Sequence, residues 1–316
     1  MSEPATWLHE VRTRTENAIL QRGVEEFQEG LRLACQSLVT RIGREYFVDA
    51  VDDALLEAVG RIEVEAAQDS RYSLLLDLAR RAHDRAPLAP LLAFTLGSYT
   101  EKQEAWLYSM GPVHELLDAD RGERRARGLK HALHDILETT YEPYLKGIII
   151  LANFSAGCPF RVPSSTLGVL VKQAVAALKR VEDGEQFATL VDPDAGWLRN
   201  ATSHRGHLYW RYLPVSDELA VHDRSREPTV FSVDDLLDRA FSLWRLSGPT
   251  FNHVVTTYLF RDFLVGTGLS RKMSAILMHW AMGEDEQATA AAQDFQALAA
   301  TVLEPLGTWG QQRGRT

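Results

Sequence analysis

Residues 197–213 read WLRNATSHRGHLYWRYL, and the segment RNATSH carries three side chains suited to chemistry on a phosphodiester. Arg199 is a permanent cation, Asn200 an amide, and His204 a group that transfers protons near neutral pH. An arginine followed by a histidine at such spacing arises by chance roughly two or three times in a chain of this composition. Requiring asparagine directly after the arginine lowers that expectation to about a few hundredths, so the segment is a candidate active site.

The charge around this segment differs from that of the whole chain. The formal net charge of -9 argues against a general nucleic-acid coat protein, which needs a basic stripe to displace counterions. Between Asp194 and Asp217, however, the sequence contains no acidic residue. The basic side chains of that stretch are Arg199, His204, Arg205, His207 and Arg211. The pattern predicts a small electropositive pocket that binds RNA where the chemistry takes place.

Composition narrows the class of protein. A chain of 316 residues with 45% hydrophobic content can bury a large core. The two cysteines, Cys35 and Cys158, have no partner at metal-ligand spacing, which argues against a disulfide framework or a zinc site. The longest apolar run, 147–154, is too short to span a bilayer, and the first residues lack the apolar core of a signal peptide. We therefore expect a cytoplasmic protein without metal or cofactor.

Apolar residues recur every three to four positions along most of the chain, which predicts an all-α helical bundle. Asp194 or Pro193 is expected to open the motif helix and Gly206 to close it. Beyond Gly206 the residues turn aromatic and β-branched, which predicts a small β-hairpin. Ser232 with an acidic residue three positions later predicts a helix start, and Pro249 is expected to open another helix. We expect two parts, a helical accessory or regulatory domain over residues 1–135 and a helical domain over residues 136–316 that ends in a C-terminal helical extension.

An inner helix that ends in Arg199, Asn200 and His204, followed by a hairpin and further helices, resembles the HEPN superfamily over roughly residues 140–265. The hallmark of that superfamily is an arginine and a histidine separated by four to six residues, often with a polar residue directly after the arginine. Many members are metal-independent endoribonucleases of phage defence or toxin–antitoxin pairs. One toxin subgroup is modified on a tyrosine two residues after the histidine, where this chain has Gly206.

The resemblance implies RNA cleavage by attack of the 2'-hydroxyl, with Arg199, Asn200 and His204 as the catalytic residues. Arg205, His207 and Tyr209 are candidate substrate contacts. Because one motif supplies one imidazole, the resemblance implies a homodimer in which two motifs form a composite site. RNA is the expected substrate, and an antitoxin or regulatory protein is a further expected partner.

Other interpretations remain open at this point. The protein is alternatively an inactive HEPN-like protein that binds RNA or a nucleotide, or a helical scaffold in which the motif is accidental. Arg199 is then structural and pairs with Asp192 or Asp194. A second polar group, His131, His134, Asp135 and Glu138, shares one helix face and is interpreted as solvated rather than metal-binding. Tyr209, Trp210 and Tyr212 either stack on an unpaired base or belong to the core.

Overall fold

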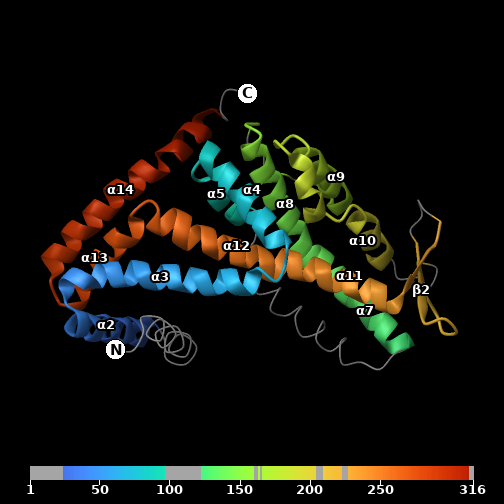
Figure 1. The fold of residues 1–316 in the computed structure, drawn as a ribbon, viewed down its shortest axis with the longest axis horizontal. Coiled ribbons are helices and arrows are strands. Elements are labelled where there is room, and N and C mark those ends of the chain that lie inside the picture. Colours follow the sequence, from blue (N-terminus) through green and yellow to red (C-terminus); the bar gives the residue numbers. More distant parts are fainter. Residues whose placement is uncertain are drawn as a thin grey trace. The chain divides into compact units, whose positions relative to one another are not determined.

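The computed structural model describes residues 24–96, 122–159, 163, 166–203, 209–222 and 227–312. The chain divides into two compact units, a terminal unit of residues 1–68 with 256–316 and a motif unit of residues 69–255. Most described residues are helical and the strands form one small sheet, which confirms the predicted all-α fold with a hairpin after the motif helix (Figure 1). No helix in the described ranges combines the length and apolar character needed to cross a membrane.

These units group the chain differently from the predicted division. The expected boundary between residues 135 and 136 falls inside the motif unit, where one helix continues directly into the next. The first two described helices pack instead on α13, which follows more than 200 residues later. Periodicity within a helix cannot reveal such a non-local pairing, because it records only which side is apolar. The roles expected for residues 1–135 and 136–316 stay a prediction.

Two helices from the start of the terminal unit pack with helices from the end of the chain. The described elements are α2 (Val24–Ile42), α3 (Arg44–Ala66), η4 (Tyr258–Val265), α13 (Leu269–Ala281) and α14 (Asp285–Gln312). Cys35, Phe47 and Met278 lie in their shared core. Arg271 on α13 reaches Asp49 and Asp52 on α3, so burial and ion pairing hold these distant segments together.

The motif unit is built around a helix that is apolar on nearly all sides. Its helices are α4 (Arg71–Arg85), α5 (Ala89–Leu96), α7 (Glu123–Asp135), η1 (Ile136–Tyr141), α8 (Glu142–Ser155), α9 (Leu167–Leu178), η2 (Gly184–Leu190), α10 (Ala195–Ser203), α11 (Val233–Arg245), η3 (Leu246–Thr250) and α12 (Phe251–Thr257), which continues into the terminal unit. Every residue from Gly147 to Phe154 of α8 is buried. Helices α4, α5 and α9 pack around α8 (Figure 1), as a helix without a polar face requires.

Two long helical runs of this unit contain π-helical turns rather than breaks. The run α7–η1–α8 includes the π-helix Ile136–Tyr141, and the run α11–η3–α12 includes the π-helix Leu246–Thr250. Pro249 lies inside the second π-helix, so the prediction that it opens a new helix is wrong. A π-turn accommodates a residue that lacks a backbone N–H donor without ending the helix. The two π-helices meet through the hydroxyls of Thr140 and Ser247, which are 2.9 Å apart.

The strands form an antiparallel sheet in the order β1 (Trp210–Leu213), β2 (Glu218–Val221) and β3 (Thr229–Ser232). Trp210 lies opposite Val221, and Leu219 lies opposite Phe231. The Ser232 hydroxyl accepts the backbone N–H of Asp235 at 2.9 Å, which confirms the predicted capping of α11. The sheet therefore lies directly between the motif helix α10 and α11 in the sequence.

Candidate functional site

The start of α10 is fixed by contacts with two other helical segments. Asp192 accepts a hydrogen bond from the backbone N–H of Asp194 at 2.9 Å and another from Nε of Arg239 on α11 at 2.7 Å. Its own backbone N–H donates to the hydroxyl of Tyr141 on η1 at 2.7 Å. Burial raises the pKa of Tyr141 above its usual value, so the phenol stays neutral. The first turn of the motif helix is thereby held in place, and it begins after Asp194 as predicted.

The buried face of α10 lies against α9 and the sheet. A Cβ placed on Gly196 would lie 2.7 Å from the Cα of Gly168 on α9, so the two backbones approach too closely for a side chain at residue 196. The Trp197 ring is buried and stacks on Phe231 of β3, with ring centroids 6.1 Å apart. These contacts fix the rotation of α10 about its axis. They leave Arg199 and Asn200 on its accessible side.

Arg199 is paired with an acidic residue that the motif itself does not contain. Its Nε donates a hydrogen bond to Oε1 of Glu138 on η1. The two side chains remain 36% and 31% exposed, so solvent still reaches the pair. Asp192 and Asp194, the partners expected if Arg199 were structural, bind Arg239 instead. The structure therefore corrects the identity of the partner and leaves the guanidinium at an accessible surface.

A histidine lies beside the same turn of α10. Nδ1 of His134 on α7 is 3.4 Å from Oγ1 of Thr202, and Thr202 is buried. The Thr202 hydroxyl donates to the backbone carbonyl of Arg199 at 3.0 Å. His134 and Glu138 are four residues apart, so they occupy successive turns of one helical face. That face contacts α10.

The polar face of α7 and η1 is only partly solvated. His131 and Asp135 are exposed, as the interpretation of a solvated face predicts. His134 and Glu138 are half-buried against α10, which the sequence pattern did not indicate. Among the described residues, no group of three or more histidine, cysteine, aspartate or glutamate side chains is arranged to hold a metal ion. The site in the described residues thus consists of a cation, a carboxylate and an imidazole.

Two of the remaining candidate residues, Asn200 and Tyr209, lie in the described ranges. Asn200 is exposed on α10. His204, Arg205 and His207 lie outside the described residues. The Tyr209 ring stacks on His222, with centroids 5.2 Å apart, and its backbone carbonyl accepts the His222 N–H at 3.1 Å. Tyr209 is half-buried at the edge of β1.

The aromatic residues after the motif do not form a continuous base-stacking surface. Trp210 is buried, and its indole N–H donates to the carbonyl of Ala126 at 3.1 Å, so it belongs to the core. Tyr212 is half-buried and its hydroxyl donates to Asp217 at 2.8 Å. Of the three aromatic residues, Tyr209 remains the candidate substrate contact.

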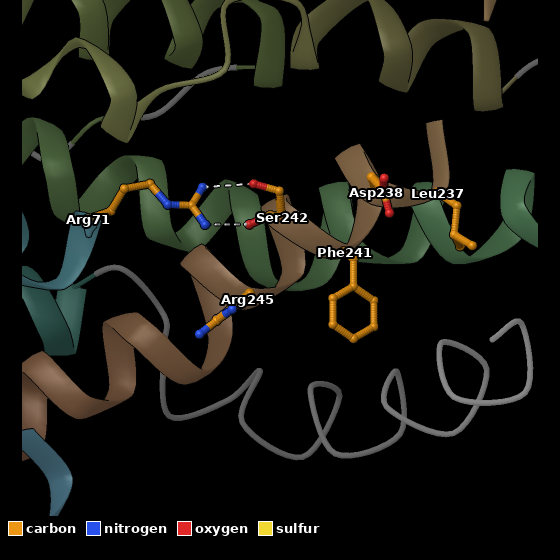
Figure 2. Close-up of a pocket in the computed structure, with 6 residues that line it drawn as sticks. All are labelled: Arg71, Leu237, Asp238, Phe241, Ser242 and Arg245. Atoms are coloured by element: carbon orange, nitrogen blue, oxygen red, sulfur yellow. Dashed lines mark hydrogen bonds between the residues drawn. The ribbon is translucent and has the colours of Figure 1, made fainter. Parts of the chain in front are cut away.

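A separate surface pocket of about 300 Å³ is lined by Arg71, Leu237, Asp238, Phe241, Ser242 and Arg245 (Figure 2). Arg71 donates to both carboxylate oxygens of Asp69 and also to the hydroxyl and carbonyl of Ser242. Its guanidinium is therefore largely used in joining α4 to α11. Asp69 and Asp238 also offset the charge of the two arginines, so the pocket is a poor anion site.

Sequence reasoning missed Glu138, His134 and Thr202 as parts of the candidate site. Glu138 and His134 lie more than 60 residues before the motif, and their signal is a pair of polar residues four positions apart on an amphipathic helix. That signal also fits an exposed polar face. The packing of α7 and η1 on α10 is needed to separate the two cases.

Comparisons of this chain with models of protein families, with curated proteins and with solved structures found no match.

Proposed function

We propose that this protein is a metal-independent endoribonuclease of the HEPN type. The observation that carries the proposal is the placement of Arg199, which lies in the middle of α10, is partly exposed and is held by Glu138. A cation fixed in this way can bind a phosphate, and in the sequence His204 directly follows the last residue of α10. The motif thus joins a positioned cation to a proton-transfer group.

Cleavage of RNA by its own 2'-hydroxyl requires removal of the hydroxyl proton, stabilisation of the charged phosphorane, and protonation of the leaving 5'-oxygen. The guanidinium of Arg199 binds the non-bridging phosphate oxygens and remains charged at any relevant pH. His204 transfers one of the two protons. Asn200 is exposed beside Arg199 and orients the phosphate or the imidazole through its amide. The products carry 2',3'-cyclic phosphate and 5'-hydroxyl ends.

The proposed activity has consequences for partners and context. Arg205, His207 and Tyr209 follow the motif and contact the RNA on either side of the cleaved bond. A homodimer brings a second motif to the site, as in the superfamily that the motif resembles. A cytoplasmic ribonuclease of this kind acts in phage defence or as a toxin, and it requires an antitoxin or a regulatory protein to restrain it.

The second candidate function is binding of RNA or a nucleotide without cleavage. It is favoured by one observation, the occupation of Arg199 Nε by the Glu138 carboxylate. A phosphate must compete with that carboxylate for the guanidinium, and a site that keeps the ion pair binds weakly and does not stabilise a transition state.

The test is incubation of total RNA with the purified full-length protein in excess EDTA. We expect cleavage by the wild type, and a loss of at least about 100-fold in Arg199→Ala and His204→Ala. Arg127→Ala removes an exposed arginine of α7 and serves as the matched control, with cleavage retained. Cleavage products should end in cyclic phosphate.

Three outcomes would contradict the proposal in different ways. Retention of RNA binding that depends on Arg199, without any cleavage, supports the inactive binding protein. Cleavage that EDTA abolishes excludes the metal-independent reaction. Loss of the folded state in Arg199→Ala, judged by circular dichroism, assigns the arginine a structural role.

A further inference from the structure

We propose that His134 is the second proton-transfer group of this site, so that a single chain supplies both imidazoles of the acid–base pair. The proposal rests on the proposed ribonuclease function and deepens it. It differs from the composite dimeric site in the source of the second imidazole. The contacts of α7 with α10 carry the argument.

The hydrogen bonds of Thr202 define which nitrogen of His134 carries a proton. The Thr202 hydroxyl has one proton, and it is donated to the Arg199 carbonyl at 3.0 Å. Toward His134 the same oxygen can therefore only accept, so Nδ1, 3.4 Å away, is the protonated nitrogen. This distance is long for a hydrogen bond. The contact with Thr202 therefore orients the imidazole ring without holding it tightly. Nε2 of His134 is left to exchange protons.

His134 and Arg199 lie along the same contact of α7 and η1 with α10. Thr202 is three residues after Arg199 and two before His204. Glu138, one turn beyond His134, is the residue that holds Arg199. His134 is half-buried, so packing restrains the side chain while part of the residue remains exposed. The π-helix that carries Glu138 begins two residues after His134, and such turns often occur at functional sites.

The chemistry needs two such groups and no other reactant. The 2'-oxygen forms a bond to phosphorus while one imidazole accepts its proton, and the bond from phosphorus to the 5'-oxygen breaks while the other imidazole donates a proton to that oxygen. No electron transfer and no water enters this step. His134 serves one of these transfers and His204 the other, which restores the starting protonation of the pair when they exchange protons with solvent.

The experiment measures single-turnover cleavage of a short RNA by the full-length wild type and by His134→Ala, His134→Gln and His131→Ala. We expect His134→Ala and His134→Gln to be slowed by about 100-fold or more, because glutamine can donate to Thr202 but cannot transfer a proton. His131→Ala removes the exposed histidine one turn earlier and should cleave at the wild-type rate. Added imidazole should restore part of the activity of His134→Ala and none of the activity of His134→Gln.

A second substrate assigns the transfer. RNA with sulfur in place of the bridging 5'-oxygen has a leaving group that needs no protonation. Recovery of His134→Ala on this substrate makes His134 the acid, whereas recovery of His204→Ala makes His134 the base. Recovery of neither variant would overturn the proposal.

Other outcomes separate this inference from the proposed function. Wild-type rates in His134→Ala, with Arg199→Ala and His204→Ala inactive, would overturn the role of His134 and leave the ribonuclease intact. Restored activity in His134→Gln would show that His134 only positions Thr202. A wild type that does not cleave RNA would overturn both.

Discussion

Two arginine–carboxylate pairs of the motif unit use the same residue types and serve different purposes. Arg71 and Asp69 link α4 to α11, and their side chains are 18% and 6% exposed. Arg199 and Glu138 link α10 to η1, and their side chains are 36% and 31% exposed. Arg71 donates from all three of its nitrogens to Asp69 and Ser242. In the described part of the chain, Arg199 contacts its carboxylate through Nε.

The exposure of the side chain and the number of its N–H donors already in use therefore distinguish a structural arginine from one that can bind a ligand. A buried guanidinium whose donors are used cannot exchange its carboxylate for a phosphate without leaving a buried charge unpaired. An exposed pair is worth little to stability, so its partner can be displaced at small cost.

Removal of the buried arginine should destabilise the protein most. In Arg71→Ala the nearly buried carboxylate of Asp69 loses its principal partner, and we expect the free energy of unfolding to fall by about 3 kcal/mol. Urea denaturation followed by circular dichroism measures this change. Arg127→Ala breaks an exposed pair with Glu123 and should change it by less than about 0.5 kcal/mol. Equal stabilities of the two variants would remove the basis of the comparison.

Removal of the partly exposed carboxylate of Glu138 should act on cleavage rather than on stability. In Glu138→Ala the Arg199 side chain loses its anchor, and under the proposed function we expect RNA cleavage to slow by about 10–100-fold. The free energy of unfolding should change by less than about 1 kcal/mol. Glu123→Ala, on the exposed side of α7, is the matched control for cleavage. An unchanged cleavage rate in Glu138→Ala would mean that Glu138 does not position Arg199.

The close approach of α10 to α9 predicts an asymmetry between two glycines. A methyl group at Gly196 would lie 2.7 Å from the Gly168 Cα, whereas one at Gly168 would lie 3.9 Å from the Gly196 Cα. We expect Gly196→Ala to lower the free energy of unfolding by about 1–3 kcal/mol, because the added methyl group overpacks the contact between α10 and α9. Gly168→Ala should be tolerated, since alanine also favours a helix over glycine. Thermal unfolding compares the two variants, and equal melting temperatures would contradict the close approach.

The buried pair should also produce a small dependence of stability on acid. Burial alone would raise the pKa of Asp69, but the hydrogen bonds from Arg71 outweigh it and lower that pKa below its usual value. The stabilisation is therefore fully present above the unfolded-state pKa of about 3.9 and is lost as the pH falls through the lower folded-state pKa. Denaturation at several pH values below about 4 should show a shallower loss in Asp69→Asn than in the wild type. A parallel pH dependence in both proteins would contradict the contribution of Asp69.

Much of the local structure of this chain follows from sequence patterns that act over a few residues. The all-round apolar segment of α8, the start of α10 after Asp194 and the capping of α11 by Ser232 are of this kind. The prediction for Pro249 was wrong. The helix accommodates the missing backbone N–H of proline by a π-turn, and this turn depends on packing against η1. The two compact units also could not be read from periodicity, since they join segments from opposite ends of the chain.

Sequence patterns alone identify which side chains of the motif can do chemistry, and they place Arg199 and Asn200 on one helix. The partners of these side chains follow from contacts between distant helices. Glu138 holds Arg199, His134 lies against Thr202, and Asp192 and Asp194 bind Arg239. This difference arises because helical periodicity fixes which residues share a face, whereas the partner of that face depends on how distant helices pack. The chemical type of a side chain is given by its own position in the sequence, whereas its spatial neighbours come from segments far away in the chain.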